Sequence, residues 1–313
     1  MSSATQVAGQ PARRLLDNIR KVVRGDSLAI QHVVIAFLAG GHVLLEDAPG
    51  VGKTILGKSL ARSLSCDFAR VQGTPDLLPS DLTGVQIYNQ KEGTFEFRPG
   101  PLHHQIILMD EVNRATPKTQ SALLEAMEER QVTVDGVTHH LPQPFLVVAT
   151  QNPIEQEGTY PLPEAQLDRF LIKSSLGYPP RDAEIAVLKD QTIQHPLESL
   201  EAVLSTEEIT SLQAQVKKVD VSEVLLGYLV DLVRFTREVG GGVTGVSPRG
   251  GLALRRASQA RAFLEGREYV TPEDIQELAS VTLGHRIYSL TDATGKVGLE
   301  VVAEALEKVE VPV

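Results

Sequence analysis

The sequence has 313 residues, 42% of them hydrophobic and 22% charged, so it can bury a sizeable core and is long enough for two domains. Its 40 acidic and 30 basic residues give a net charge of −10, which argues against a protein that works mainly by gripping nucleic acid. The single cysteine, Cys66, excludes an intrachain disulfide and favours a structural thiol. No secretory signal or membrane span is visible, so a cytoplasmic protein is expected.

The first half of the chain alternates apolar strands with amphipathic helices. Strands alternating with helices predict an α/β fold built on a parallel, doubly wound sheet. Thr116 is placed to cap one of the helices, with Pro117 at its first position. The predicted helices cover 11–23, 28–38, 55–64 and 117–129, and the predicted strands cover 42–45, 68–71, 106–109, 145–149 and 171–174.

A glycine-rich loop joins the strand at 42–45 to the helix at 55–64. Glycines let backbone N–H groups converge on an anion, and the new helix N-terminus adds free donors. Lys53 can reach the β- and γ-phosphates, and Thr54 can offer a hydroxyl to Mg²⁺. We therefore predict an ATP-binding P-loop that comprises Pro49, Gly50, Val51, Gly52, Lys53, Thr54 and Ile55.

One position departs from the strict P-loop pattern, because Asp47 stands where that pattern has glycine. An ordinary Gly-Pro turn is the alternative interpretation of this loop. A second motif favours the nucleotide-binding interpretation over the turn.

This second motif is the apolar run 106–109, which ends in Asp110 and Glu111. In P-loop enzymes an Asp at this place holds Mg²⁺, and the next acid can orient or deprotonate the attacking water. A strand that ends in a solvated acidic turn is the alternative for such a run on its own. Because ligands in open α/β sheets bind at the carboxyl ends of the strands, both motifs are expected at the same edge.

Two predicted hairpins interrupt the alternation, at 85–97 and 131–139, and the second contains the turn Asp135-Gly136. Neither is needed to bind a nucleotide, so each has another role or is surface decoration.

After Tyr178-Pro179-Pro180 only helices are predicted, with capping boxes that begin at Ser205 and Thr271. Ser247 can cap a further helix, with Pro248 and Arg249 in its first turn. We predict an αβα core over residues 1–178 and a small all-helical domain over residues 181–313.

The order of these motifs resembles that of AAA+ ATPases, and its detail resembles the MoxR family, in the branch with a hairpin inserted into helix 2. The resemblance implies a P-loop AAA+ core followed by a helical lid, with ATP and Mg²⁺ as cofactors. It also implies that Lys53 and Thr54 bind phosphate and metal. Asp110 would hold the metal and Glu111 would activate water. The matching stretches are Thr74–Gly84, Asp110–Ala115, Ala149–Phe170 and Ser247–Arg249, in addition to the P-loop.

The resemblance gives roles to further polar residues. Asn152 matches sensor 1, which positions the attacking water, although a simple Asn-Pro turn is the alternative. Arg169 matches the arginine finger that such ATPases insert into a neighbour's site, with a surface arginine paired with Asp168 as the alternative. Arg249 matches sensor 2, acting on its own or a neighbour's nucleotide. Arg114 is a weaker candidate for a second contact with the neighbour.

Three functions stay open at this stage. The resemblance implies a ring, expected to be a hexamer, that acts as a chaperone. Its clients would include proteins with von Willebrand factor type A domains, sometimes for metal insertion. A nucleic-acid motor is disfavoured because residues 131–141 carry no Lys or Arg beyond Arg130. A nucleotide-gated scaffold without hydrolysis is disfavoured because Glu111, Asn152 and Arg169 are all present.

Overall fold

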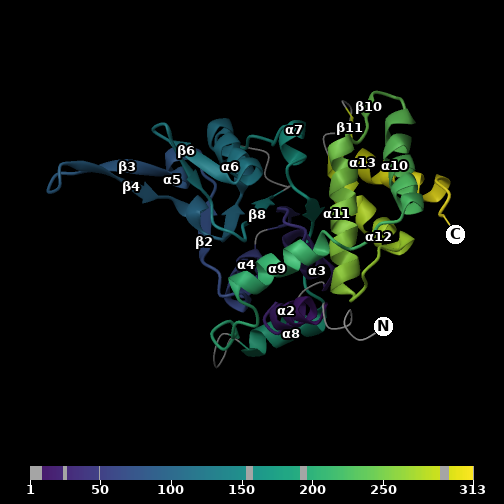
Figure 1. The fold of residues 1–313 in the computed structure, drawn as a ribbon, viewed down its shortest axis with the longest axis horizontal. Coiled ribbons are helices and arrows are strands. Elements are labelled where there is room, and N and C mark those ends of the chain that lie inside the picture. The colour runs from purple at the N-terminus through teal and green to yellow at the C-terminus, as the bar shows by residue number, and fades with distance from the viewer. Residues whose placement is uncertain are drawn as a thin grey trace.

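The computed structural model (Figure 1) describes residues 9–23, 27–48, 50–152, 158–190, 196–289 and 296–312. A five-stranded sheet lies at its centre, with the strand order β2-β5-β8-β1-β9 and all neighbours parallel. Each strand agrees with its predicted range to within two residues, and the predicted parallel sheet is confirmed. The strands are β1 (Val43–Glu46), β2 (Phe68–Gln72), β5 (Ile106–Asp110), β8 (Leu146–Gln151) and β9 (Ile172–Ser174).

Both faces of the sheet are covered, because successive side chains of each strand point to opposite sides. Val43 and Leu45 of β1 belong to one hydrophobic cluster, whereas Leu44 between them belongs to another. The first cluster is built with α2 (Gln10–Arg20), α3 (Ser27–Leu38) and α4 (Lys53–Ser63), and the second with α5 (Pro79–Thr83) and α6 (Pro117–Glu129). Thr116 caps α6 by accepting a hydrogen bond from the Thr119 backbone, as predicted.

Both predicted hairpins are present, and the first extends away from the body of the molecule (Figure 1). Its exposed face carries Tyr88 and Phe95, whose ring centroids lie 5.2 Å apart. Phe97 joins the two hairpins by stacking on His139, with 3.8 Å between ring centroids. The hairpin strands are β3 (Gly84–Asn89), β4 (Thr94–Pro99), β6 (Gln131–Val134) and β7 (Val137–His140).

The described part of the chain after residue 180 is helical, as predicted, with one pair of short strands as an addition. Both predicted capping boxes are formed, at Ser205 and Thr271. Ser247 stands at the predicted N-cap, but its side chain makes no capping hydrogen bond. The addition is a pairing of β10 (Val243–Thr244) with β11 (Tyr288–Ser289), which is too short to leave a strand period in the sequence. The helices are α8 (Arg181–Asp190), α9 (Thr206–Val216), α10 (Glu223–Glu238), α11 (Pro248–Leu264), α12 (Pro272–Leu283) and α13 (Lys296–Lys308).

Helices α10 to α13 gather at one end of the molecule, opposite the extended hairpin (Figure 1), whereas α9 lies against the core. Gln213 of α9 donates a hydrogen bond to the Phe37 carbonyl at the end of α3, at 2.7 Å. The first hydrophobic cluster also continues from the core into the helices beyond. The predicted boundary between residues 178 and 181 therefore stays a prediction. Within the described ranges, we find no helix of the length and apolarity that crossing a bilayer requires.

His42 is a buried histidine at the start of β1. Its Nδ1 accepts a hydrogen bond from the Val147 backbone at 2.9 Å, and its Nε2 lies 3.1 Å from the Met127 carbonyl oxygen. Burial, and then the charge of Arg130, hold the His42 pKa well below its usual value of 6.5. The unfolded chain takes up a proton as the pH falls through 6.5, but the folded chain does not. The stability contributed by neutral His42 is thus complete above this pH and is lost below it.

We expect His42→Asn to weaken the acid sensitivity of folding. Between pH 6.5 and about pH 5.5, the free energy of unfolding should fall by up to about 1.4 kcal/mol more in the wild-type protein than in the variant. Urea denaturation at the two pH values measures this difference. Equal losses in the two proteins would show that His42 is not the titrating group.

Candidate functional site

The carboxyl ends of three neighbouring strands bring most of the predicted site together. Strand β8 lies between β5 and β1, so Asp110, Gln151 and Glu46, at the ends of these strands, share one edge of the sheet. The loop at residues 47–52 follows β1 at that edge and leads into α4. The P-loop, the two acids and Asn152 are therefore neighbours in the fold.

The backbone of the glycine-rich loop has the conformation that an anion-binding loop requires. Gly50 has φ = 87° and Gly52 has φ = 98°, both in the left-handed region. Apart from the glycine's own neighbours in the chain, no atom of the described residues lies within 4 Å of the place where a Cβ would stand on either residue. Their conformation, and not lack of space, therefore calls for glycine. Lys53, the first residue of α4, donates hydrogen bonds to the carbonyls of Asp47 at 3.0 Å and Ala48 at 3.3 Å.

The other predicted P-loop residues surround these glycines. Val51 is half-buried between them, and Thr54 and Ile55 lie in the first turn of α4. The predicted loop residue Pro49 lies outside the described residues.

Asp47, which replaces the first glycine of the strict pattern, has a structural role. Asp47 is only 4% exposed. It accepts hydrogen bonds from the Ser175 hydroxyl at 2.7 Å and from the backbone N–H groups of Leu176 at 2.8 Å and Gly177 at 2.9 Å. The P-loop is thereby tied to the segment that leaves β9, a connection that a glycine could not make.

We expect Asp47→Ala to lower the free energy of unfolding by about 2–3 kcal/mol, because it leaves one buried and one half-buried backbone donor without their acceptor. Asp76→Ala, a change of an exposed carboxylate, is the matched control and should change stability by less than about 0.5 kcal/mol. Chemical denaturation of the two variants measures both values. Similar stabilities would mean that the Asp47 contacts are not what anchors the loop.

Asp110 ends β5 as a buried carboxylate with two side-chain partners. Arg70 donates from Nε to its Oδ2 at 2.7 Å, and Thr150 donates from its hydroxyl to its Oδ1 at 3.2 Å. The Arg70 side chain is half exposed, so this arginine can leave the carboxylate without crossing a packed interior. The sequence analysis missed both partners, because each lies 40 residues from Asp110 along the chain.

Glu111 turns away from the strand in a left-handed conformation, with φ = 52°. Such a conformation is uncommon for a residue with a side chain and often occurs at functional sites. Its N–H donates to the Thr150 hydroxyl at 2.9 Å, so Thr150 bridges the two acids. Its Oε2 accepts from Gln72 at 2.8 Å and from Arg114 at 3.3 Å. Arg114 therefore lies at the acid of its own subunit.

Oxygen ligands for a small hard cation are present at this edge. The Thr54 hydroxyl follows the P-loop after β1, and the Asp110 carboxylate ends β5. Among the residues that the structure describes, no group of three or more His, Cys, Asp or Glu side chains could hold a metal. Mg²⁺ at a phosphate site needs only one or two protein ligands, with phosphates and water completing its shell. The donor set thus fits Mg²⁺ together with a polyphosphate.

Asn152 directly follows β8 and is 8% exposed. Its strand lies between the one that carries the two acids and the one that leads into the P-loop. This is the position that a residue aligning a water between Glu111 and a terminal phosphate would need.

The two other predicted site residues, Arg169 and Arg249, lie at the opposite edge of the sheet. Arg169 lies three residues before Ile172, the first residue of β9, and that strand runs parallel to β1. Helix α6 follows β5 and runs back from the carboxyl edge of the sheet. Glu128, near the C-terminus of this helix, therefore lies at the amino edge. Arg169 Nε contacts Glu128 Oε2 at 3.1 Å, and Arg249 Nη2 binds the other oxygen of the same carboxylate.

The alternative interpretation paired Arg169 with Asp168, and the structure gives Asp168 a different partner. Asp168 Oδ1 accepts from Arg286 Nε at 2.7 Å. The local sequence does not predict the contacts of Glu128 or Arg286, because the partners of each are distant in the chain and come together only in the folded structure.

A basic hollow surrounds the two arginines. Its volume is about 440 Å³, and its charged lining consists of five arginines against two acids. This excess of positive charge suits an anionic group such as a phosphate. The charged residues that line it are Arg130, Arg169, Arg249, Arg256, Arg286, Glu128 and Asp168.

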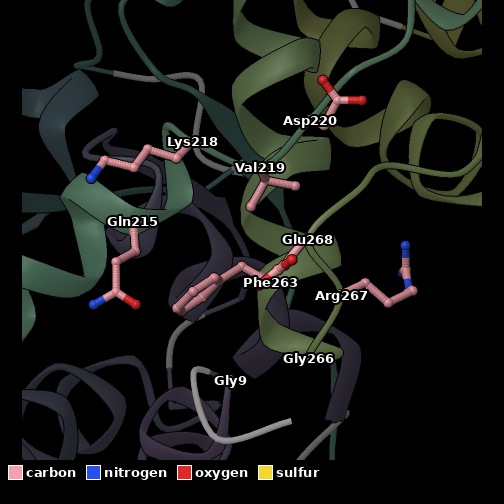
Figure 2. Close-up of a pocket in the computed structure, with 9 residues that line it drawn as sticks. All are labelled: Gly9, Gln215, Lys218, Val219, Asp220, Phe263, Gly266, Arg267 and Glu268. Carbon is pink, nitrogen blue, oxygen red and sulfur yellow. The ribbon is translucent and has the colours of Figure 1, made fainter. Parts of the chain in front are cut away.

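A separate cavity of about 380 Å³ lies where the end of α9 faces the end of α11 (Figure 2). The side chains of Lys218 and Arg267 point to opposite sides of it, and Phe263 lies between them (Figure 2). Neither the P-loop nor the two acids line this cavity. Its charged groups do not converge on a common point, so we assign it no part in nucleotide chemistry.

Cys66 does not supply a nucleophile. Burial, and then the charge of Asp67, raise the pKa of its thiol to about 12. Because only the thiolate is reactive, the interpretation as a structural thiol agrees with the structure.

Residues 42–172 match the model of the ATPase family associated with various cellular activities (AAA), and residues 236–305 match the AAA lid domain. The chain is 51% identical to the uncharacterized protein YeaC of Bacillus subtilis, over 96% of this chain and 94% of that protein. It is 40% identical to the chaperone MoxR1 of Mycobacterium tuberculosis, over 90% of this chain and 76% of that protein.

Among solved structures, the chain resembles the crystal structure of a candidate ATPase from Cytophaga hutchinsonii. The TM-score is 0.90 at 40% sequence identity, and the match covers 99% of this chain and 97% of the other. A similarity of this extent includes both the central sheet and the helices that follow it.

Proposed function

The chain belongs to the MoxR family of AAA+ ATPases, and from this premise we propose that it runs a magnesium-dependent ATP cycle in a ring of identical subunits. The ring, which we propose to be a hexamer, acts as a chaperone that remodels or matures partner proteins. The observation that carries the ring is the separation of the site into two halves at opposite edges of the sheet.

The first half binds the nucleotide. Residues 49–55 would hold the phosphates of ATP, with Lys53 moving from its loop carbonyls onto the β- and γ-phosphates. Thr54 and Asp110 would ligate Mg²⁺, which neutralises phosphate charge when bound. Arg70 would then leave Asp110, and Thr150 would keep the carboxylate oriented.

Glu111 would accept a proton from the attacking water as a general base, and Asn152 would align that water with the γ-phosphate. The positive φ of Glu111 supports this role, because it turns the carboxylate out of the strand, toward Gln72 and Arg114.

The second half would serve the next subunit of the ring. Strand β1 has four residues, so at about 3.3 Å per residue the two edges lie about 13 Å apart. Arg169 and Arg249 would both act in trans, inserting positive charge beside a neighbour's γ-phosphate. Their shared contact with Glu128 and the basic hollow around them support this assignment over a cis role for Arg249.

Client proteins would bind outside these two half-sites. The exposed aromatic face of the β3–β4 hairpin, with Tyr88 and Phe95, is a surface suited to a protein partner. We propose that the clients include proteins with von Willebrand factor type A domains or metal cofactors. We propose that the protein acts in the cytoplasm. Residues 1–178 would form its core domain and residues 181–313 its lid domain.

A trap tests this function. Tagged Glu111→Gln protein loaded with ATP is recovered from native lysate, and its companions are identified by mass spectrometry against a Lys53→Ala control. A chaperone should retain a defined protein only in the ATP-locked form, and adding Phe95→Ser should release it if the hairpin makes the contact. An empty trap, or nuclease-sensitive nucleic acid in place of protein, would contradict the proposal.

A nucleic-acid motor finds less support in the structure. Arg130, which directly precedes the β6–β7 hairpin, donates hydrogen bonds to the carbonyls of Phe145 at 2.7 Å and Gly40 at 2.6 Å. It is therefore engaged within the subunit. On the β3–β4 hairpin, Lys91 and Arg98 are balanced by Glu92 and Glu96. No salt-dependent stimulation of ATP turnover by DNA is expected.

A further inference from the structure

A buried guanidinium from the lid binds the segment that carries Arg169 on both sides of that residue. Arg286 is 4% exposed and lies in the short helix η3 (Gly284–Arg286). Its Nε donates to Asp168 Oδ1 at 2.7 Å, and its Nη2 donates to the carbonyls of Phe170 at 2.7 Å and Asp168 at 3.2 Å. Its Nη1 also reaches the Leu171 carbonyl at 3.4 Å. Both flanks of Arg169 are thus bound to one side chain.

Two neighbours of Arg286 extend this attachment. The Tyr288 hydroxyl donates to the Glu164 carbonyl at 2.6 Å, and His285 Nε2 lies 3.1 Å from the Phe170 carbonyl oxygen. Glu164 begins the short helix α7 (Glu164–Leu167), which leads into the Arg169 segment. The stretch from 164 to 171 is therefore bound at several points by lid residues between 285 and 288.

Arg286 also packs against the helix that carries Arg249. A Cβ on Gly250 would stand 2.9 Å from Arg286 Cδ and 2.3 Å from Val246 Cγ1, so α11 meets Arg286 without room for a side chain. Gly250 is the residue directly after Arg249. The two arginines that share Glu128 are thus both adjacent to Arg286 through their own backbone segments.

The chemistry of this contact requires arginine. A planar guanidinium can bind a carboxylate and several carbonyls at once, whereas a lysine ammonium is a point charge without the same fork. Burial lowers the pKa of the Arg286 guanidinium, and the charge of Asp168 opposes that shift. The buried Arg286 guanidinium therefore favours one geometry, because moving it away from its acceptors would leave a buried charge unpaired.

We propose that Arg286 is a positioning residue: from the lid, it fixes Arg169 and Arg249 relative to each other, so that both arginines are presented to the neighbouring subunit as one unit. The inference rests on the proposed trans role of these arginines. It assigns to the lid a part in the neighbour's hydrolysis. Because its guanidinium is engaged by Asp168 and by backbone carbonyls, Arg286 would act through the two arginines and not on the nucleotide itself.

The test uses Arg286→Lys in the full chain, with Arg267→Lys as the matched control. Arg267 binds Asp274 with two hydrogen bonds inside the lid, away from residues 164–171. We expect Arg286→Lys to lower ATP turnover by about 10–100-fold and to change the Kd of a fluorescent ATP analogue by less than about twofold. Arg267→Lys should leave both values near those of the wild type.

Subunit mixing separates positioning from a purely structural effect. Arg286→Lys subunits keep an intact nucleotide site, and Glu111→Gln subunits keep intact arginines. In an equal mixture about one interface in four pairs the two productively, so turnover should rise to about a quarter of the wild-type rate from two nearly inactive parents. If Arg286→Lys does not fold, as judged by circular dichroism, Asp168→Asn takes its place with the same expectation.

Wild-type turnover by folded Arg286→Lys, or no recovery on mixing, would overturn the inference. Arg169→Ala, mixed in the same way, identifies which claim has failed. Recovery with Arg169→Ala but not with Arg286→Lys would refute the positioning role alone. Recovery with neither would refute the trans arginine itself, and with it the inference.

Discussion

Glu111→Gln is expected to retain ATP binding and to lower ATP turnover by about 10²–10⁴-fold. The amide can still accept the hydrogen bond from Gln72 Nε2 and has nearly the same shape, so the turn after β5 should keep its geometry. What it lacks is a basic oxygen for the proton of the attacking water. Binding and hydrolysis are therefore predicted to separate cleanly in this one variant.

Phosphate release measures the turnover of this variant, and a fluorescent ATP analogue measures its Kd. Glu300→Gln, a change of an exposed glutamate on α13, is the matched control and should behave as the wild type does. Lys53→Ala is the contrasting change and should weaken binding itself. Wild-type protein without measurable turnover would favour the nucleotide-gated scaffold, and equal turnover in wild type and Glu111→Gln would remove Glu111 from the chemistry.

The sheet could be predicted because its signals are local. The first four residues of β5 form an uninterrupted apolar run, every residue of the strand is buried, and the two acids mark the point where it reaches the edge. The alternation of strands and helices then leaves few ways to arrange a parallel sheet. This reasoning predicted the P-loop, Asp110 and Glu111 at one edge, and the family resemblance added Asn152.

The partners of these residues could not be predicted, because each contact is made between distant parts of the chain. Glu128 and Arg249 are 121 residues apart, and Arg286 and Asp168 are 118 residues apart. At such separations, the sequence alone allows many equivalent pairings between acidic and basic residues. Asp168, the neighbour in sequence, was therefore the natural partner to consider for Arg169, and it was wrong. Asp47 shows the same limit, because its three donors lie beyond β9.

Arg169→Ala is the second change with a large expected effect, a loss of about 10³-fold in turnover with ATP binding unchanged. The expectation follows from the position of Arg169 at the amino edge, across the sheet from its own P-loop. Removing it leaves Glu128 paired with Arg249, so the subunit loses no buried partner and should fold normally. Arg234→Ala, a change of an exposed arginine on α10, is the matched control.

An arginine that acts in trans has one further consequence that a cis arginine does not have, because turnover then depends on assembly. Turnover per wild-type subunit should rise with protein concentration as rings assemble, whereas the residual turnover of Arg169→Ala should stay flat over the same range, because assembly no longer completes its site. Size measurements by light scattering at each concentration connect the two curves to the degree of assembly. Turnover that is independent of concentration in assembling wild-type protein would mean that each subunit carries a complete site, and Arg169 would then have to act within its own chain.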